Sequence, residues 1–184
     1  MNNFTLLQKF RNKIRVAQDT QLDVAQRAKI VNCTIRVKGK NNQLIIKEGA
    51  RLRDSTVEII GDACLIEIGT NCMIGKGSYL SAKEAKSKLI IGDDCGLSRN
   101  VKVMTSDGHP IYQNGIRINP AKDITIENYV WIGDNVTILK GVHIGKGSIV
   151  AAGSVLTKSI PDMCIAAGNP AKIIKYLDNE KENK

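Results

Sequence analysis

Aromatic side chains are scarce in this sequence of 184 residues, where they make up 4% of the chain, with one tryptophan and two phenylalanines. Hydrophobic residues nevertheless make up 42%. A core of this composition must be filled by smaller aliphatic side chains in a regular arrangement. No apolar stretch approaches the roughly 20 residues that a membrane-spanning helix needs. The composition therefore excludes a membrane-spanning protein and predicts one soluble domain, because about 150 residues is a typical domain length.

Cysteines occur in no pattern typical of a disulfide framework or a metal site. They are odd in number, and no two form a C-x-x-C pair; they are Cys33, Cys64, Cys72, Cys95 and Cys164. We predict free thiols and no metal ion. The first residues also lack the pattern of a secretory signal peptide, so the expected compartment is the cytoplasm.

Positive charge is concentrated in the first third of the chain. The net charge is +9, and residues 1–60 hold twelve lysines and arginines against five acidic residues. A field of this sign attracts nucleic acids, anionic lipid surfaces, acidic polymers and phosphorylated cofactors, and it is also typical of a solvated basic face.

An aliphatic residue recurs every six positions, without a gap from residue 126 onward. The series contains Ile46, Leu52, Ile68, Ile74, Leu80, Ile91, Leu97, Val103, Ile126, Ile132, Ile138, Ile144, Val150 and Leu156. A period of six does not match the 3.6 residues of a helical turn, and the β-branched residues and glycines also disfavour a helix. Three short strands and three corners per eighteen residues predict a triangular coil whose aliphatic side chains point inward and stack on those of neighbouring coils. Insertions after the third hexad of each group should all leave from one edge of the stack, and the longest covers about residues 105–123.

Three of the cysteines and both chain ends can be placed relative to this pattern. Cys64, Cys72 and Cys95 fall at the small fifth position of a hexad, which predicts that they fill the core. We divide the chain into a basic helical cap over residues 1–29, a β-helix over 30–163 and a C-terminal segment over 164–184 with a helix and a charged tail. Apolar residues at helical spacing in the cap are expected to pack on the open end of the coils or to contact anionic lipid; they are Leu6, Leu7, Phe10 and Ile14.

Four motifs resemble one known family. They are Trp-Ile-Gly-Asp-Asn-Val at 131–136, Ile-Gly-Lys-Gly-Ser at 144–148, Ala-Ala-Gly-Ser-Val-Leu-Thr-Lys at 151–158 and Ala-Gly-Asn-Pro-Ala-Lys at 167–172. The chain resembles the hexapeptide-repeat acyltransferases, in the branch with galactoside, maltose and surface-polysaccharide O-acetyltransferases. The resemblance implies an all-β, left-handed parallel β-helix, acetyl-CoA as co-substrate, no nucleic-acid partner, and a homotrimer with active sites between subunits.

His109 is the candidate catalytic base. It lies in Ser-Asp-Gly-His-Pro at 106–110, inside the longest insertion, where the family carries its catalytic histidine. A base with a pKa near neutrality suits the activation of an alcohol for attack on a thioester. Strand alternation places His143, the only other histidine, on the surface. The sequence leaves open whether Asp107 or a backbone carbonyl orients the imidazole.

Trp131 should face outward, where it lies in the trimer interface or contacts acetyl-CoA or a sugar. For the cofactor, the resemblance implies contacts from Asp134, Ala152, Thr157, Lys158, Lys172 and Lys175. The stretch at 78–88 is basic where galactoside enzymes carry an Asn and an Asp, and Arg99 and Lys102 follow nearby. These cations favour a negatively charged saccharide, such as a capsular polymer or its precursor.

Other functions remain open on the sequence alone. The acceptor could be an amine of an amino sugar or the hydroxyl of an antibiotic, because the repeat does not distinguish these nucleophiles. A β-helix without catalytic activity is a further alternative. Contact of the basic N-terminal third with an anionic membrane or polymer is also left open.

Overall fold

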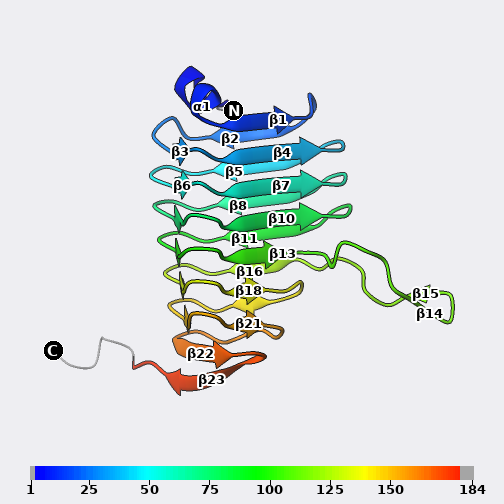
Figure 1. Ribbon diagram of the computed structural model, residues 1–184, viewed down its shortest axis with the longest axis vertical. Coiled ribbons are helices and arrows are strands. Elements are labelled where there is room, and N and C mark those ends of the chain that lie inside the picture. The colour runs from blue at the N-terminus through cyan, green and yellow to red at the C-terminus, as the bar shows by residue number, and fades with distance from the viewer. Residues whose placement is uncertain (1–2, 179–184) are drawn as a thin grey trace.

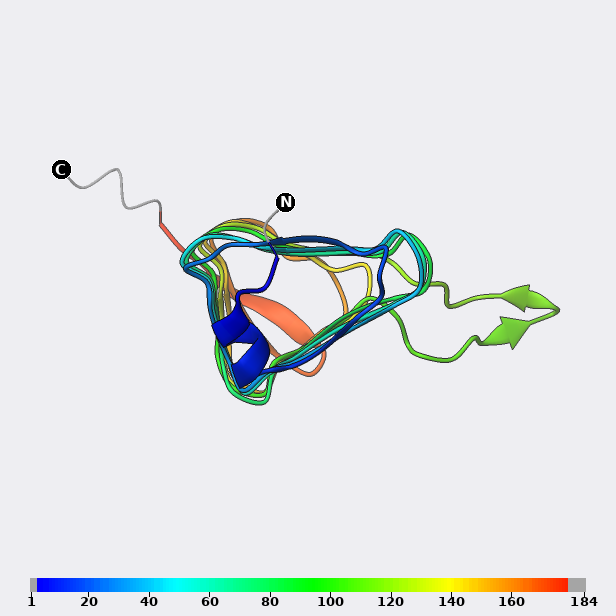
Figure 2. The same ribbon diagram turned by 90° about the horizontal axis from the view of Figure 1, so that it is seen from above.

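The chain folds as a parallel β-helix with a triangular cross-section. The computed structural model describes residues 3–178, so the charged tail expected over residues 178–184 lies outside them apart from Asp178. Figure 1 shows the coils stacked along one axis, and Figure 2 shows the three sides of the prism viewed down that axis. No helix in residues 3–178 has the length and apolar character needed to cross a membrane.

Each side of the prism is one sheet, and the strands of successive coils lie side by side in these three sheets. Sheet A contains β1 (Lys13–Val16), β4 (Thr34–Lys38), β7 (Thr56–Ile60), β10 (Tyr79–Lys83), β13 (Lys102–Met104), β18 (Thr137–Ile138) and β21 (Val155–Leu156). Sheet B contains β2 (Gln21–Val24), β5 (Gln43–Ile46), β8 (Leu65–Ile68), β11 (Lys88–Ile91), β16 (Ile124–Ile126) and β19 (His143–Ile144). Sheet C contains β3 (Lys29–Val31), β6 (Arg51–Arg53), β9 (Met73–Ile74), β12 (Gly96–Leu97), β17 (Trp131–Ile132), β20 (Ile149–Val150), β22 (Cys164–Gly168) and β23 (Ala171–Tyr176).

The predicted aliphatic series forms the core, in vertical columns of side chains. Leu80, for example, is in register with Val57 of the preceding coil and Val103 of the following coil, and all three are fully buried. The cysteines predicted to fill the core are also buried, and the most exposed of them, Cys95, has an exposed fraction of 2%. A narrow interior of this kind has room for aliphatic side chains and thiols, which explains the low aromatic content.

The corners between strands use left-handed backbone. Asn71, Asn100 and Asn135 have φ values of 57° to 59°. Asparagine tolerates this conformation better than most residues because its short side chain forms local hydrogen bonds. The Asn100 amide donates to Asn135 Oδ1 of the next coil at 3.0 Å, so the corners are linked from coil to coil as the strands are.

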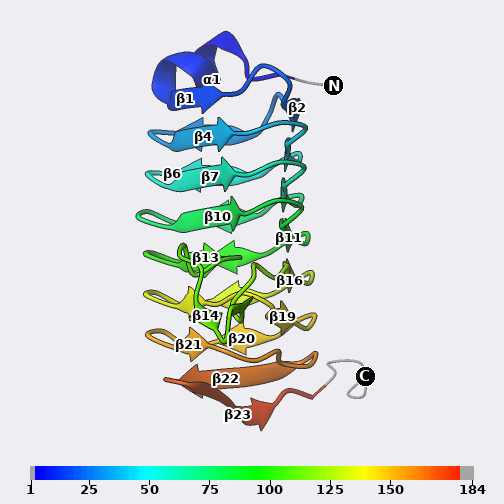
Figure 3. The same ribbon diagram turned by 90° about the vertical axis from the view of Figure 1, so that its right-hand side faces the viewer.

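Both ends of the chain differ from the expected helices. The N-terminal helix α1 covers only Leu6–Arg11, and the β-helix starts at Lys13, well before residue 30. The early coils were missed because the six-residue pattern is weak before Ile46. The predicted C-terminal helix is wrong: β23 pairs antiparallel with β22. This pairing gives hydrogen-bond partners to the edge of β22, which an isolated helix would leave unsatisfied. Figure 3 shows these two strands closing the lower end of the stack.

A buried acidic group on sheet A predicts a pH dependence of stability. Glu58 accepts hydrogen bonds from Tyr79 Oη at 2.6 Å and from Arg36 Nε at 2.7 Å, and it lies 2.8 Å from Lys83 Nζ. Burial alone would raise the Glu58 pKa, but the hydrogen bonds from Lys83, Tyr79 and Arg36 outweigh it and lower the pKa to about 2. The stabilisation is therefore present above the ordinary pKa of 4.5 and is lost as the pH falls toward 2.

We expect Glu58→Gln to remove this dependence. Wild type should lose more free energy of unfolding than Glu58→Gln between about pH 6 and pH 3, measured by urea unfolding. Equal losses in the two proteins would contradict the role of Glu58.

Candidate functional site

The longest insertion is a loop that projects from one corner of the prism. It joins β13 to β16 and carries the hairpin of β14 (Tyr112–Gln113) and β15 (Ile116–Arg117). Figures 1 and 2 show this hairpin standing away from the coils. His109 is exposed on the loop, and so are four large apolar side chains, Ile111, Tyr112, Ile116 and Ile118. Apolar surface of this extent on a protruding loop is typical of a contact with another molecule.

Asn119 holds the backbone next to His109. Its side-chain amide donates to the His109 carbonyl oxygen at 2.8 Å and to Asp107 Oδ2 at 2.9 Å. Its Oδ1 accepts from the Ile111 amide at 2.6 Å. Asn119 is buried, so these three bonds tie together the two strands of the loop on either side of the histidine.

Two ion pairs fix this loop to the coils. Lys140 Nζ, which follows β18, donates to Asp107 Oδ2 at 2.6 Å and to the Asn119 carbonyl oxygen at 2.9 Å. Lys140 holds the pKa of Asp107 below its ordinary value. Arg117 Nη2 pairs with Glu84 Oε1 at 2.7 Å and lowers the pKa of that carboxyl group. Because Lys140 and Asn119 engage the Asp107 carboxylate, its role here is to anchor the loop.

A groove of about 650 Å³ runs along the outer face of sheet C. Met73, Gly96 and Trp131 are in register in three successive coils, and Gly96 leaves a gap between the two larger side chains. Trp131 faces outward as predicted, with 57% of its surface exposed. The remaining lining residues are Lys29, Val31, Arg51, Leu52, Arg53, Ile74, Gly75, Lys76, Leu97, Ser98, Arg99 and Asp134.

The upper part of this groove is strongly basic. Lys29 and Arg51 are in register in neighbouring coils, and Arg53 is in register with Val31. Among the described residues, Lys29, Arg51 and Arg53 form no ion pair with an acidic side chain. The sequence signal for this feature is the alternation Arg-Leu-Arg at 51–53, since an inward Leu52 forces both arginines outward. The upper groove therefore offers unneutralised cations to a ligand.

A second hollow, of about 430 Å³, lies on the other side of Trp131. It brings together Trp131, Asp134 and Ala152, three of the predicted site residues. Asp134 is paired with Arg99, whose Nη2 lies 2.5 Å from Asp134 Oδ2, and this pair lowers the pKa of the Asp134 carboxyl group. The small residues Gly133 and Ala151 complete a shallow surface along which an extended ligand can lie.

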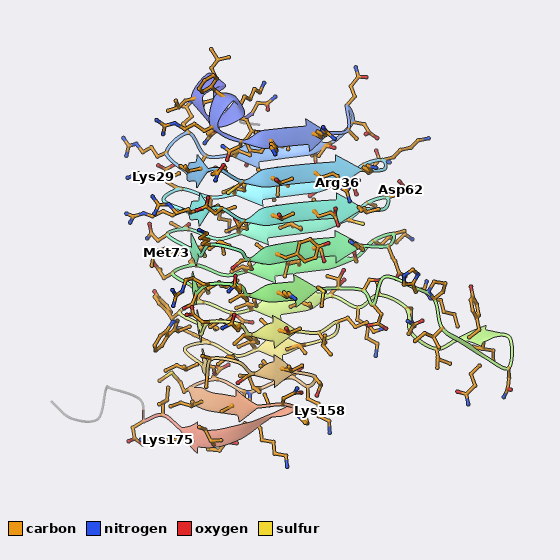
Figure 4. All side chains as sticks on the ribbon, viewed as in Figure 1. Lys29, Arg36, Asp62, Met73, Lys158 and Lys175 are labelled. Carbon is orange, nitrogen blue, oxygen red and sulfur yellow. The ribbon has the colours of Figure 1, made fainter. Side chains whose placement is uncertain are left out.

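One chain does not bring the other predicted cofactor residues to this hollow. Thr157 and Lys158 follow β21, at the end of sheet A. Lys172 and Lys175 are exposed on β23, and Lys175 is in register with Ile165 of β22. Figure 4 shows Lys158 and Lys175 on opposite sides of the prism. His143 is exposed, as expected, and its Nε2 lies 3.7 Å from Glu127 Oε1.

The loop anchors Asn119, Lys140 and Arg117 were not found by sequence reasoning. They act through pairs 12 to 33 residues apart, such as Asn119 with Asp107 and Lys140 with Asp107. No spacing rule connects such positions, so only the fold reveals them.

Comparisons with known proteins agree with this architecture. Residues 123–158 match the family described as "Bacterial transferase hexapeptide (six repeats)". The chain is 42% identical over 132 residues to a polysialic acid O-acetyltransferase of Escherichia coli O1:K1, covering 71% of this chain and 42% of that protein. It is 38% identical over 128 residues to a polysialic acid O-acetyltransferase of Neisseria meningitidis, covering 68% of this chain and 58% of that protein. The chain thus spans about half the length of these curated relatives.

A solved structure extends the agreement over most of the fold. The crystal structure of the polySia-specific acetyltransferase NeuO superposes with a TM-score of 0.71 at 36% identity, covering 90% of this chain and 80% of that one. The chain therefore belongs to the hexapeptide-repeat transferase family, and its fold is that family's left-handed parallel β-helix.

Proposed function

We propose that this protein is an O-acetyltransferase that moves the acetyl group of acetyl-CoA to a hydroxyl of an acidic polysaccharide or its precursor. The observation that carries the proposal is the basic groove of sheet C, where Lys29, Arg51 and Arg53 lie free above Trp131. Two relatives are named polysialic acid O-acetyltransferases, after an acidic polymer whose negative charge is complementary to such a groove. The expected compartment is the cytoplasm, where we place the reaction.

His109 is the proposed general base. Its imidazole accepts the proton of the acceptor hydroxyl while the hydroxyl oxygen attacks the thioester carbonyl. Backbone N–H groups stabilise the negative charge that develops on the carbonyl oxygen. The carbon–sulfur bond then breaks, and the departing thiolate of CoA takes the proton from the imidazolium. The hydroxyl has become an acetyl ester, and His109 is neutral again.

The separation of His109 from the groove supports a homotrimer with its active sites between subunits. The loop projects away from its own prism, so the loop of a neighbouring copy is the one that reaches Trp131. The exposed Ile111, Tyr112, Ile116 and Ile118 gain cover in such a contact.

The predicted cofactor residues lie in separate places on one chain, and a homotrimer would account for this. Asp134 and Ala152 supply the surface beside Trp131, against which the pantetheine arm can lie. Thr157, Lys158, Lys172 and Lys175 are exposed at other edges, from which they approach the phosphates of a CoA bound between two copies. Lysine ammonium groups suit phosphates as mobile point charges.

The first experiment measures loss of the acetyl-CoA thioester by its absorbance. Acceptors should include an acidic oligosaccharide, its neutral counterpart and an amino sugar. We expect turnover with the acidic acceptor, an ester product, and less turnover with the neutral one. Transfer only to the amine, or no transfer to any saccharide, would contradict the proposal.

Removing the two free arginines should weaken acceptor binding selectively. We expect Arg51→Gln/Arg53→Gln to raise KM for the acidic acceptor about tenfold or more, since a hydrogen bond to a charged group contributes about 1.5–3 kcal/mol. KM for acetyl-CoA and kcat at saturation should stay unchanged. Steady-state kinetics at low salt measure both constants.

The matched control is Lys38→Gln/Lys40→Gln, which removes the same charge at the corner between sheets A and B. Figure 4 labels Asp62 at this corner, on the side away from Lys29 and Met73. An equal rise of KM in both double variants would show that the net charge of the protein, and not the groove, determines acceptor binding.

A further inference from the structure

The helix α1 contacts the β-helix mainly through polar side chains. Gln8 Nε2 donates to the Ala28 carbonyl oxygen at 3.0 Å, and Asn12 Nδ2 donates to the Ile30 carbonyl oxygen at 2.8 Å. Asn12 Oδ1 also accepts from the Cys33 amide at 2.7 Å. The open edge of the first coils has backbone groups that need such partners. Of the large apolar side chains in this segment, Phe4 is the one that packs in the core.

Of the four apolar side chains expected to cap the coils, Ile14 on β1 packs against the core, whereas the three on α1 face outward. Leu6 is 87% exposed, Leu7 57% and Phe10 90%. Figure 2 shows α1 at the open end of the prism, over one of its sides. Three large apolar side chains on one short helix form an exposed patch, which we call the α1 patch. Such a patch is typical of a binding surface.

Exposed basic residues lie on α1 itself and on the strand that follows it. Lys9 and Arg11 lie on the helix itself, and Lys13 and Arg15 follow on β1; all four are exposed. Residues 3–31 contain six lysines and arginines against two aspartates. An apolar stripe flanked by cations is the arrangement that favours the interface of an anionic bilayer.

We propose that this end of the protein docks on an anionic lipid bilayer through the α1 patch. Leu6, Leu7 and Phe10 would enter the boundary between head groups and acyl chains, and Lys9, Arg11 and Lys13 would contact the lipid phosphates. A second copy of this chain is a poorer occupant, because end-to-end contact would bring the same cations together. A protein docked in this way would stand with the α1 end of the stack on the bilayer and the other coils extending from it. Sheet C would then stay accessible to a glycan.

The test is co-sedimentation of the full chain with vesicles. One set contains phosphatidylcholine alone, and the other contains phosphatidylcholine with roughly one third phosphatidylglycerol. We expect binding to the anionic vesicles that weakens with added salt. Leu6→Gln/Phe10→Gln should lower the vesicle partition coefficient by about 100-fold or more, because each large apolar side chain lost from the membrane costs about tenfold or more.

The matched control is Ile174→Gln/Tyr176→Gln, which removes exposed apolar surface from β23 at the opposite end of the stack and should bind vesicles like wild type. Circular dichroism checks that both double variants are folded. Absence of binding by wild type, or equal binding by Leu6→Gln/Phe10→Gln, would overturn the proposal. Sedimentation velocity adds one more outcome: end-to-end association that the α1 variant abolishes, without vesicle binding, would assign the patch to a second copy.

Discussion

His109→Ala is expected to lower kcat for acetyl transfer by about 10² to 10⁴-fold, the usual contribution of a general base. KM for acetyl-CoA should change little, because the proposal assigns the imidazole to proton transfer and places the cofactor contacts at Trp131, Ala152 and the C-terminal lysines. The measurement is steady-state turnover with the acidic acceptor, with absorbance of the thioester as readout.

His143→Ala is the matched control for this variant. His143 is the only other histidine in the sequence, and it is exposed on sheet B beside Glu127. We expect it to keep wild-type kcat. A His109→Ala protein as active as wild type would overturn the mechanism, whatever the state of the control.

Asn119→Ala is expected to lower kcat about 100-fold, because a misplacement of about 1 Å at a reacting group costs that much. Asn119 positions the histidine through the bonds to the His109 carbonyl oxygen, to Asp107 and from the Ile111 amide. Because none of these bonds lies in the coils, the unfolding midpoint in urea should stay near that of wild type. KM for acetyl-CoA should also be unchanged.

A purely structural role for Asn119 predicts a different result. General loosening of the fold would lower the unfolding midpoint and change both kinetic constants together. Asn119→Asp keeps the acceptor for the Ile111 amide but loses both donated bonds, so we expect no rescue. Gln113→Ala, at the exposed hairpin of the same loop, should have wild-type kinetics.

The repeat could be predicted from sequence because its signal is local and strong. The inward aliphatic residues of the series from Ile126 to Leu156 follow one another at a fixed interval of six, and the strand register confirms the columns. The outward direction of Trp131 and His143 followed from the same phase. These positions needed no knowledge of distant contacts.

The chain ends could not be predicted in this way. Residues 171–176 contain good helix formers, but the unpaired edge of β22 decides their conformation. At the other end, Leu6 and Phe10 are spaced like residues that face a core. The backbone groups of Ala28, Ile30 and Cys33 need polar partners, so Gln8 and Asn12 occupy the buried face instead. In both places a hydrogen-bond requirement outweighs local sequence preference.

The coil register has a consequence for how such a protein can change in length during evolution. Ile46 and Ile68 occupy equivalent positions in neighbouring coils. Loss of residues 47–68, or their duplication, would keep every later column in phase and move the ends of the stack by one strand spacing, about 4.8 Å. The loop that carries His109 and the hollow beside Trp131 would be unaffected, while the basic groove above them became shorter or longer. The size of acceptor that fits could thus be selected by the number of coils, independently of the chemistry.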